Sequence, residues 1–277
     1  MPELPEVQTV VDTLAPRVVG KKIYGVIHAR TDMIRPAGFD LCKAIRRHVV
    51  KSITRRAKRI VFELDDSNRF YIHLGMSGRM SVESPAAPIE KHTHLIIRLT
   101  QTGEQIRFRD PRRFGGIFWL GNSRDETGTA QSDNLGPEPL VVRPRVLHAR
   151  LQRTRRAIKN ALLDQNLIAG LGNIYVDESL FEARIHPLSP ANELTDAQVR
   201  RLSRAIKLTL RRALRNRGST LRDYVDANGQ TGAFQKRHRV YGRANEKCRV
   251  CKSPIQRIVL GGRSTHFCAK CQPRRDE

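Results

Sequence analysis

The sequence contains no apolar run that approaches the roughly 18 residues needed to cross a membrane. Its N-terminus also lacks the basic and then apolar segment that marks a secretory signal. We therefore expect a cytosolic protein without membrane association. Cysteine is scarce too, since Cys42 is the only one outside a cluster at the C-terminal end, and we assign no role to it.

Acidic residues are few compared with basic ones. Lys and Arg number 51 against 27 Asp and Glu, which gives a formal net charge of +24 spread along most of the 277 residues. A balance of this size favours binding to a polyanion, with nucleic acid first. The alternative to polyanion binding is a surface that is basic only in a general way and serves solubility. Internal repeats and low-complexity tracts are also absent, and the length suits two domains or two with a small appendage.

The first part of the chain changes from one short helix to strands. Residues 5–15 place Val7, Val10, Val11 and Leu14 at helical spacing, with Pro16 and Gly20 as stop signals. From residue 22 to about 120 the runs IVFEL, RFYIHL, HLIIRLT, QIRFRD and GIFWL are short, β-branched or aromatic, and separated by turns. This pattern predicts a β-rich domain, either a sandwich or a barrel.

The second part is helical. Residues 121–146 are polar, contain Gly and Pro, show no periodicity, and indicate a linker. RAIKNALLDQ predicts a helix, and the glycine-rich turn IAGLGNIYVDESLF follows it. A longer helix starts at a capping box from Thr195 to Gln198 and stops at Gly218.

Four cysteines near the C-terminus form two CxxC pairs. Cys248, Cys251, Cys268 and Cys271 have the spacing C-x2-C-x16-C-x2-C, which predicts one structural Zn²⁺ ion held by four thiolates. A redox role is typical of a single CxxC pair and fits two pairs poorly. Because four thiolates leave no open position on the metal, we expect the ion to fold this segment and to do no chemistry.

The stretch between the two pairs, IQRIVLGGRSTHF, predicts a hairpin that turns at Gly261 and Gly262. Arg263 then lies at or near the tip, where its guanidinium can grip a phosphate. The alternative is an ordinary solvated arginine.

The opening MPELPEV raises the possibility of an N-terminal nucleophile. Pro2 is small, so Met1 is a candidate for removal, and an α-amino group has a pKa near 7.7 to 8.0 against about 10.4 for lysine. Attack of the Pro2 amine on an aldehyde carbon would give a cationic iminium, with Glu3 and Glu6 within a turn for proton transfer. The alternative is an ordinary helix start with proline and acids in its first turn.

A series of further segments carries a resemblance to a known family. RRAKR, HLGMSGRM, DPRRFGG, NLGPEPL, LDQNLIAGLGNIYVDESLF, GSTLRDY and VYGR, together with the first residues and the cysteine module, follow one another in order from residue 1 to about 272. The chain resembles the bacterial formamidopyrimidine-DNA glycosylase family, also called 8-oxoguanine DNA glycosylases. The resemblance implies base-excision repair: removal of 8-oxoguanine opposite cytosine and of formamidopyrimidines, then strand cleavage by β,δ-elimination.

The same resemblance implies an α+β multidomain fold. It consists of an N-terminal β-sandwich with the N-terminal helix (residues 1–130), a linker (131–146), a helix-two-turn-helix domain (147–240) and a zinc ribbon (241–277). Damaged double-stranded DNA would lie in the cleft between the two lobes, bound by a monomer in the bacterial cytosol, at the nucleoid. Residues 218–237 resemble the loop that closes over the flipped base.

Residue roles follow by resemblance. Pro2 corresponds to the nucleophile that attacks C1′, and Glu3 to the acid that protonates the opening sugar. Lys58 corresponds to the lysine of β-elimination and Arg263 to the arginine of δ-elimination. Glu6 and Glu178 correspond to further acids of the pocket. Met76, Arg112 and Phe114 correspond to residues inserted where the nucleotide leaves the stack; core packing is the alternative for Met76. DNA contacts are expected from His92, Arg112, Arg155, Lys159, Asn173 and Tyr241; the adjacent Arg156 is an alternative to Arg155.

Some positions depart from the family's commonest form. Gln8, Thr93 and Ser264 stand where Glu, Asp and Gly are frequent, which leaves the support of His92 and the turn beside Arg263 in doubt. Two other functions stay open. One is an endonuclease VIII-like glycosylase for oxidised pyrimidines, disfavoured by LPEV, DPRRFGG and GSTLRDY. The other is a zinc-dependent DNA-binding protein without catalysis, which would result if Met1 were retained.

Overall fold

The computed structural model describes residues 1–99, 103–122 and 134–274. Thr100 at the end of one expected strand, residues 123–133 within the expected linker region 121–146, and residues 275–277 of the expected ribbon lie outside this range. The chain divides into two compact units. The N-terminal unit consists of Met1–Ser132 and Asn216–Ala233, and the C-terminal unit of Asp133–Arg215 and Phe234–Glu277.

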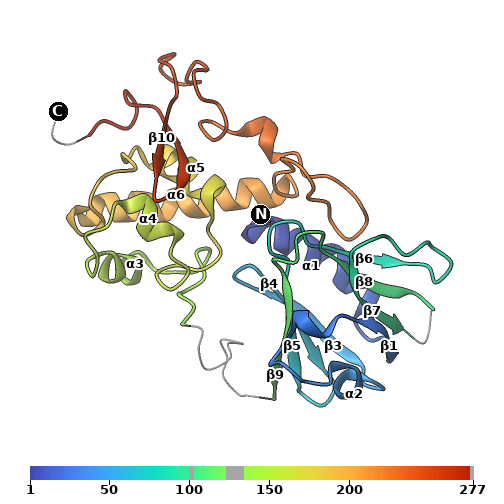
Figure 1. The fold of residues 1–277 in the computed structure, drawn as a ribbon. Helices are drawn as coiled ribbons and strands as arrows, with labels where there is room; N and C mark the ends of the chain where they lie inside the picture. The colour runs from blue at the N-terminus through green and yellow to red at the C-terminus, as the bar shows by residue number, and fades with distance from the viewer. Residues whose placement is uncertain (100–102, 123–133, 275–277) are drawn as a thin grey trace. The chain divides into compact units, whose positions relative to one another are not determined.

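The N-terminal unit is a β-sandwich with a helix packed on it (Figure 1). One sheet has the strand order β1 (Ile23–Ala29), β7 (Thr93–Leu99), β8 (Gln105–Arg109) and β6 (Arg79–Glu83), all antiparallel. The other has the order β2 (Ile34–Arg35), β9 (Gly116–Gly121), β5 (Arg69–His73), β4 (Arg59–Leu64) and β3 (Val50–Arg56), with only β2 and β9 parallel among its described pairs. A 3-10 turn (Thr31–Met33) and a short helix α2 (Leu41–Ile45) connect strands.

Helix α1 (Leu4–Val18) packs on β3, β4 and β6 through the apolar stripe seen in the sequence. Val7, Val10 and Leu14 share one buried core with residues of both sheets, including Phe62 and Phe108. The helix continues through Pro16, where the sequence predicted its end. Pro16 has no N–H to donate to the Asp12 carbonyl. Because Asp12 and Pro16 both lie on the exposed side of the helix, water can hydrate this carbonyl instead.

The C-terminal unit begins with helices. It contains α3 (Pro144–Leu151), α4 (Ile158–Leu163), α5 (Asn173–Ala183) and α6 (Asp196–Arg215), with 3-10 turns at Ala191–Glu193 and Phe234–Arg237. The predicted capping box opens α6, because the Gln198 N–H donates to Thr195 Oγ1 and the Thr195 N–H donates to Gln198 Oε1. Helix α6 packs on α3 and α5.

The described end of the expected linker is attached to these helices. The Gly136 N–H donates to the Gln165 carbonyl at 2.8 Å, and the Ala169 N–H donates to the Pro137 carbonyl at 3.1 Å. A side chain at position 136 would meet the Asn166 carbonyl oxygen at 2.7 Å, which explains the glycine. Residues 134–142 are therefore part of the C-terminal unit and are not a free spacer.

The four-cysteine segment also belongs to the C-terminal unit. Its hairpin consists of β10 (Gln256–Leu260) and β11 (Arg263–Phe267), joined by Gly261 and Gly262, which both have positive φ. Cys248, Cys268 and Ile255 share a small core with Phe181 of α5 and Val240. The predicted hairpin and its turn are thus confirmed.

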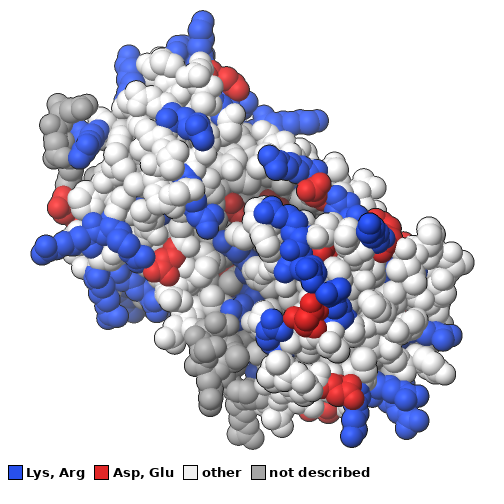
Figure 2. Space-filling view, viewed as in Figure 1, with Lys and Arg blue, Asp and Glu red and all other residues white. Residues whose placement is uncertain are grey.

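None of the helices in the described parts of the chain is both long and apolar enough to cross a membrane. Basic side chains are widely distributed over the surface. On the face shown in Figure 2, Lys and Arg clearly outnumber Asp and Glu, as the composition requires.

Candidate functional site

The residues predicted to carry chemistry at the N-terminus meet at the start of α1. Pro2, Glu3 and Glu6 are all buried. The Glu3 N–H donates to Glu6 Oε2 at 2.9 Å, and the Glu3 carboxylate accepts the Glu6 N–H, which completes a capping box. Both carboxyls are therefore held next to Pro2 by the local geometry of a helix start.

Glu6 also connects this helix start to residues 216–233. Its Oε1 accepts the Ser219 N–H at 2.7 Å, and its carbonyl accepts the Tyr224 hydroxyl at 3.2 Å. A side chain at Gly218 would lie 2.5 Å from Glu6 Oε1, so the approach requires glycine. The sequence prediction grouped this loop with the helical domain at 147–240, whereas these contacts bind it to the N-terminal unit.

Lys58 lies at the turn between β3 and β4, after Ala57, whose φ is +54°. Only 8% of its surface is exposed. The turn adjoins the strands on which α1 packs.

His73, on the neighbouring strand β5, is held neutral. Burial, reinforced by the positive charges of Arg59 and Lys58, lowers its pKa to about 4, and the Gly75 N–H donates to Nδ1 of the neutral ring.

The three predicted void-filling residues lie on two loops that touch. Met76 and Phe114 are 43% and 55% exposed, which excludes core packing for Met76. The guanidinium carbon of Arg112 lies 4.5 Å from the ring centre of Phe114, in cation–π geometry. A side chain at Gly75 would meet the Gly115 nitrogen at 2.4 Å, so the loops are in direct contact.

Asp110, which the sequence analysis did not single out, holds these loops together. It is fully buried, and its carboxylate accepts the Ser77 hydroxyl at 2.6 Å and the Gly115 N–H at 2.7 Å. Its carbonyl lies 2.9 Å from His94 Nε2. The only signal in the sequence is its place at the head of DPRRFGG, where an aspartate before proline favours a turn.

His92, a predicted DNA contact, is exposed beside these loops and has a positive φ. Its carbonyl accepts the Asp110 N–H.

Glu178 has a different environment from the one expected. Its carboxylate accepts the N–H groups of Arg239, Val240 and Tyr241 at 2.8 to 3.0 Å. Burial raises the pKa of this carboxyl, against the effect of the three donors. The residue is thus occupied in fixing the backbone that carries Tyr241, whose ring packs against His238 and His266.

The prediction that Lys159 contacts the DNA backbone is wrong for this structure. Lys159 is completely buried and its ammonium group pairs with Asp177 at 2.6 Å. Asn173, expected at a phosphate, donates its side-chain amide to the Ser264 carbonyl at 2.9 Å. Arg155 is exposed, whereas the adjacent Arg156 is paired with Asp164 at 2.8 Å, which favours Arg155 of the two for an external ligand.

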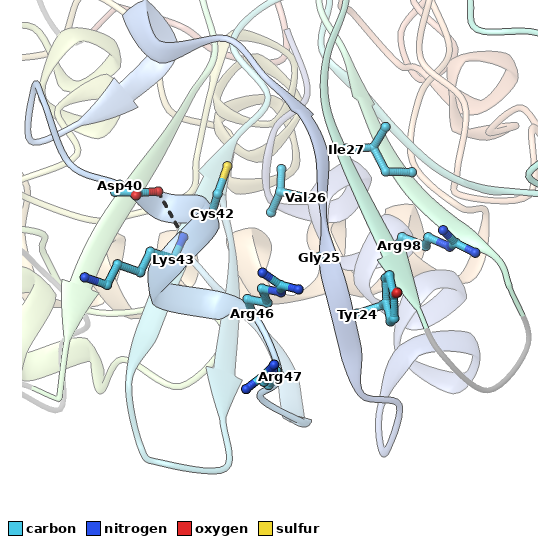
Figure 3. Close-up of a pocket in the computed structure, with 10 residues that line it drawn as sticks. All are labelled: Tyr24, Gly25, Val26, Ile27, Asp40, Cys42, Lys43, Arg46, Arg47 and Arg98. Atoms are coloured by element: carbon cyan, nitrogen blue, oxygen red, sulfur yellow. Dashed lines mark hydrogen bonds between the residues drawn. The ribbon is translucent and has the colours of Figure 1, made fainter.

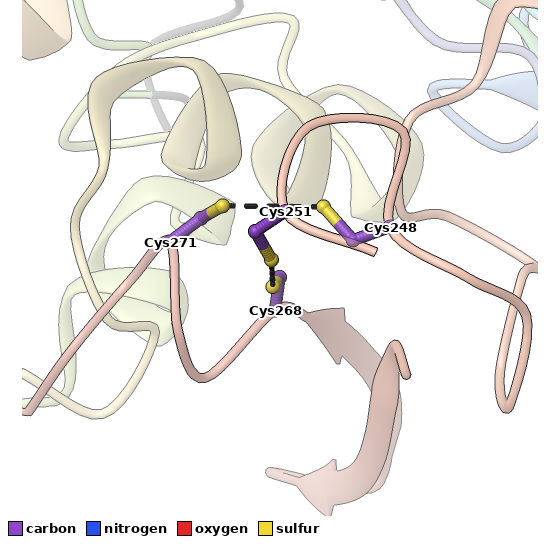
Figure 4. A group of neighbouring side chains, drawn as sticks. All are labelled: Cys248, Cys251, Cys268 and Cys271. Carbon is purple, nitrogen blue, oxygen red and sulfur yellow. Dashed lines mark hydrogen bonds between the residues drawn. The ribbon is translucent and has the colours of Figure 1, made fainter. Parts of the chain in front are cut away.

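The four cysteines fit a zinc ion. Their sulfurs lie within 4.8 Å of one another, with Cys251 to Cys268 at 3.3 Å and Cys248 to Cys271 at 3.9 Å (Figure 4). A tetrahedral site with Zn–S bonds of about 2.3 Å places its sulfurs about 3.8 Å apart. Arg263 is exposed at the first position of β11, opposite Leu260, which confirms its predicted place beside the hairpin turn.

One cavity lies away from all of these residues. It measures about 670 Å³ and lies between β1 and α2, lined among others by Tyr24, Cys42 and Arg98 (Figure 3). The Arg98 guanidinium stacks on the Tyr24 ring at 4.9 Å. None of the predicted site residues lines this cavity, so the presence of a large cavity does not identify the catalytic site.

The β-sandwich with Pro2 buried at the start of α1, the Arg-rich helical unit and the four-cysteine hairpin are together the parts of a DNA-binding protein with a zinc finger. Three family models match in order: the formamidopyrimidine-DNA glycosylase N-terminal domain at residues 1–117, the H2TH domain of that glycosylase at 135–225, and the zinc finger found in FPG and IleRS at 245–274. The chain belongs to the formamidopyrimidine-DNA glycosylase family.

Individual relatives agree over the whole length. The chain is 43% identical to the formamidopyrimidine-DNA glycosylase of Bacillus subtilis, covering 99% of this chain and 100% of the relative, and 44% identical to that of Bacillus licheniformis with the same coverage. Among solved structures, a Lactococcus lactis FPG mutant in complex with a Fapy-dG containing DNA matches with a TM-score of 0.91 at 36% identity, covering 99% and 100% of the two chains. The Lactococcus lactis Fpg with an abasic site containing DNA gives 0.90 at 36% identity, covering 98% and 100%.

Loss of the metal is expected to remove the finger and with it DNA binding. Cys248→Ser should abolish stoichiometric zinc, because a buried thiolate ligand is lost from a site whose metal supplies the folding energy. We expect affinity for an abasic-site duplex to fall about a hundredfold or more, since phosphate contacts dominate such binding. Zinc content and fluorescence anisotropy measure both effects.

Cys42→Ser is the matched control, because it makes the same chemical change at an exposed cysteine outside the cluster. It should leave zinc content and affinity unchanged. Equal DNA affinity of Cys248→Ser and the wild type would contradict the role of the finger.

Acid is expected to destabilise both units through two histidines, His238, which is buried, and His73, which is partly buried. Burial lowers the pKa of His73 in one unit and of His238 in the other to about 4. Because the unfolded histidine has a pKa near 6.5, the unfolded state binds the proton first, so stability is complete above about pH 6.5 and falls as the pH approaches 4. The difference corresponds to about 3 kcal/mol per histidine.

Urea unfolding between pH 7.5 and 4.5 measures this loss. His238→Gln, which cannot take up a proton, should show a flatter decline than the wild type in the transition of its unit. An identical pH dependence of the two proteins would contradict the assignment.

Proposed function

We propose that this protein repairs DNA by base excision, as a DNA N-glycosylase and abasic-site lyase that removes 8-oxoguanine and formamidopyrimidines. The observation that carries the proposal is the buried start of α1, where Pro2 precedes two carboxyls fixed by a capping box in a chain that matches the family from end to end. Its partner is damaged double-stranded DNA, which it binds as a monomer. Acting on chromosomal DNA, it works in the bacterial cytosol, at the nucleoid.

Pro2 acts as the nucleophile once Met1 is removed. Its nitrogen attacks C1′ while the bond from C1′ to the base breaks and the base leaves with the electron pair. Once the nitrogen has lost its proton, its lone pair breaks the bond from C1′ to O4′, and Glu3, buried at the adjacent position, supplies the proton that O4′ takes up as the sugar opens. The product is a cationic iminium, because the nitrogen of proline already has two carbon substituents.

The iminium makes strand cleavage possible. It accepts the electrons released when C2′ loses a proton, which expels the 3′ phosphate, and Lys58 near the turn of β3 and β4 assists this step. In the second elimination C4′ loses a proton, the released electrons pass through the conjugated iminium, and the bond from C5′ to the phosphate oxygen breaks. Arg263 on the finger binds this 5′ phosphate and promotes its departure. The zinc ion, when bound by the four cysteines, supplies only the fold of the hairpin that carries Arg263.

Met76, Arg112 and Phe114 fill the place of the extruded nucleotide. Met76 and Phe114 are exposed apolar wedges, and Arg112 can donate hydrogen bonds to the base left unpaired. His92, Arg155, Asn173 and Tyr241 are proposed to contact the DNA backbone. For Asn173 this leaves the N–H at the start of α5 as the donor, because its side-chain amide is used within the protein.

Borohydride trapping tests the proposal. The protein is incubated with a duplex that contains one 8-oxoguanine opposite cytosine, and in parallel with a dihydrothymine duplex, while the intact mass reports whether Met1 is present. A covalent adduct at Pro2 on the first duplex is expected. Preference for the second would indicate an enzyme for oxidised pyrimidines. No adduct with either, from protein that lacks Met1 and holds zinc, would indicate a DNA-binding protein without catalysis.

A further inference from the structure

A completely buried ion pair lies beneath the finger hairpin. Lys159 of α4 and Asp177 of α5 both have 0% exposed side chains, and their charged atoms are 2.6 Å apart. Buried ion pairs can often be replaced by apolar residues of similar volume without loss of stability, so the packing of α4 on α5 does not by itself account for a charged pair at this place. The polar atoms must therefore be explained by what else they bind.

Both members of the pair bind the backbone of β11. Lys159 Nζ donates to the Ser264 carbonyl at 2.8 Å, and Asp177 Oδ2 accepts the His266 N–H at 2.9 Å. The Asp177 carboxylate also lies 3.3 Å from the His266 ring nitrogen Nδ1. The pair thus occupies one acceptor and one donor of the strand, two residues apart on the same edge.

One further hydrogen bond fixes the same hairpin on the helices, and the hairpin turn lies close to α4. Asn173 Nδ2 donates to the Ser264 carbonyl at 2.9 Å, so this oxygen has two donors from two helices. A side chain at Gly261 would lie 3.1 Å from Asn160 Oδ1, so the turn itself lies against α4. Ser264 follows Arg263 directly, and its carbonyl is therefore the first fixed point after the exposed arginine.

We propose that Asp177 and Lys159 are positioning residues for Arg263: they fix β11 on α4 and α5, so that the arginine meets the phosphate released last. This inference rests on the proposed function, because the part of Arg263 in δ-elimination is itself proposed. A misplacement of about 1 Å at a reacting group can cost about a hundredfold in rate. Loss of the anchor should therefore affect δ-elimination and spare the steps that depend on Pro2.

Asp177→Asn tests the anchor. The asparagine can keep one acceptor for Lys159, but its amide NH₂ then faces the His266 N–H, and one strand bond is lost. On a duplex with a preformed abasic site we expect borohydride trapping within about twofold of the wild type. We expect the share of δ-elimination product to fall about tenfold. Asp196→Asn, with the same charge change at an exposed carboxylate of α6, should alter neither quantity.

A double variant separates positioning from stability. Lys159→Met with Asp177→Leu fills the same space with apolar side chains and should fold and bind zinc. The side chains at positions 159 and 177 then bind neither the Ser264 carbonyl nor the His266 N–H, and only the Asn173 contact to Ser264 remains. We expect its δ share to stay low and the amides of β11 to exchange with deuterium at least tenfold faster than in the wild type. A wild-type δ share in this folded double variant would overturn the proposal, as would unchanged exchange in β11.

The experiments distinguish a failure of the proposed function from a failure of the anchor. If the wild type gives no trapped adduct, the proposed function fails, while the exchange of the β11 amides still decides whether the pair anchors the hairpin. If trapping is normal and Asp177→Asn has a normal δ share with unchanged exchange, the anchor fails and the proposed function stands.

Discussion

Pro2→Gly is expected to lower the yield of borohydride-trapped adduct about a hundredfold on an 8-oxoguanine duplex. Glycine at position 2 still allows an α-amine, so the reaction is weakened and not chemically forbidden. Two properties are lost: the pyrrolidine ring, which fixes the nitrogen relative to Cα, and the second carbon on nitrogen that makes the iminium cationic without a further proton. A misplaced nucleophile alone can account for about two powers of ten.

Single-turnover trapping, with intact mass recorded for each preparation, measures this effect. Pro5→Gly is the matched control, since Pro5 lies in the first turn of the same helix, is buried, and has no amine to lose. It should cost some stability and leave the trapping rate within a few-fold. A trapping rate for Pro2→Gly equal to that of Pro5→Gly would show that the nucleophile lies elsewhere.

Retention of Met1 provides a stricter version of the same experiment. In the chain with Met1, the nitrogen of Pro2 is part of an amide and its lone pair is delocalised into the carbonyl. Protein that retains Met1 should give no adduct at Pro2 and should still bind the duplex. An adduct of normal yield from such protein would exclude Pro2 as the nucleophile.

Features set by local geometry were predictable from the sequence. The capping box from Thr195 to Gln198 needs only one turn of helix, and the two CxxC knuckles with Gly261 and Gly262 between them need only a hairpin. The five strands read from the sequence also correspond to β4, β5, β7, β8 and β9 of the structure. In each case neighbouring residues carry the whole signal.

Features set by long-range pairing were not predictable. Strand β3 reads VKSITRR, and its three basic residues hide the alternation, because β3 is the edge strand of its sheet and tolerates charge. Lys159 was expected at the DNA backbone from the family resemblance, and lysine is seldom buried in general. Its burial depends on Asp177, 18 residues along, and on the backbone of β11, 105 residues along. No local pattern specifies that meeting.

The contact of Glu6 with Ser219 is another long-range pairing that the sequence did not predict, and it bears on function. The sequence indicated an acid near the amine, and the structure adds that each carboxylate oxygen holds a different backbone N–H group. Oε2 accepts from Glu3, next to the nucleophile, and Oε1 accepts from Ser219, at the start of the loop that resembles the cover of the flipped base. We propose that removal of a base depends on this cover, whereas cleavage at a site already without a base does not.

Glu6→Gln is therefore expected to separate the two activities. The amide has one oxygen, so its NH₂ must face either the Glu3 or the Ser219 N–H, and a buried donor without an acceptor costs about 1 to 3 kcal/mol. We expect excision of 8-oxoguanine to fall roughly ten- to a hundredfold, since each 1.4 kcal/mol corresponds to about a factor of ten. Cleavage of a preformed abasic site should fall less than about threefold, because the Glu3 N–H can keep the remaining oxygen.

Single-turnover rates on the two duplexes measure the split, with Glu63→Gln as the control for the same change on the half-exposed side of β4. Equal losses on both duplexes would assign Glu6 to proton transfer at the sugar, a step that both substrates share. A loss confined to 8-oxoguanine would instead mean that the carboxylate acts through the loop, because only the path to base removal depends on the Ser219 contact.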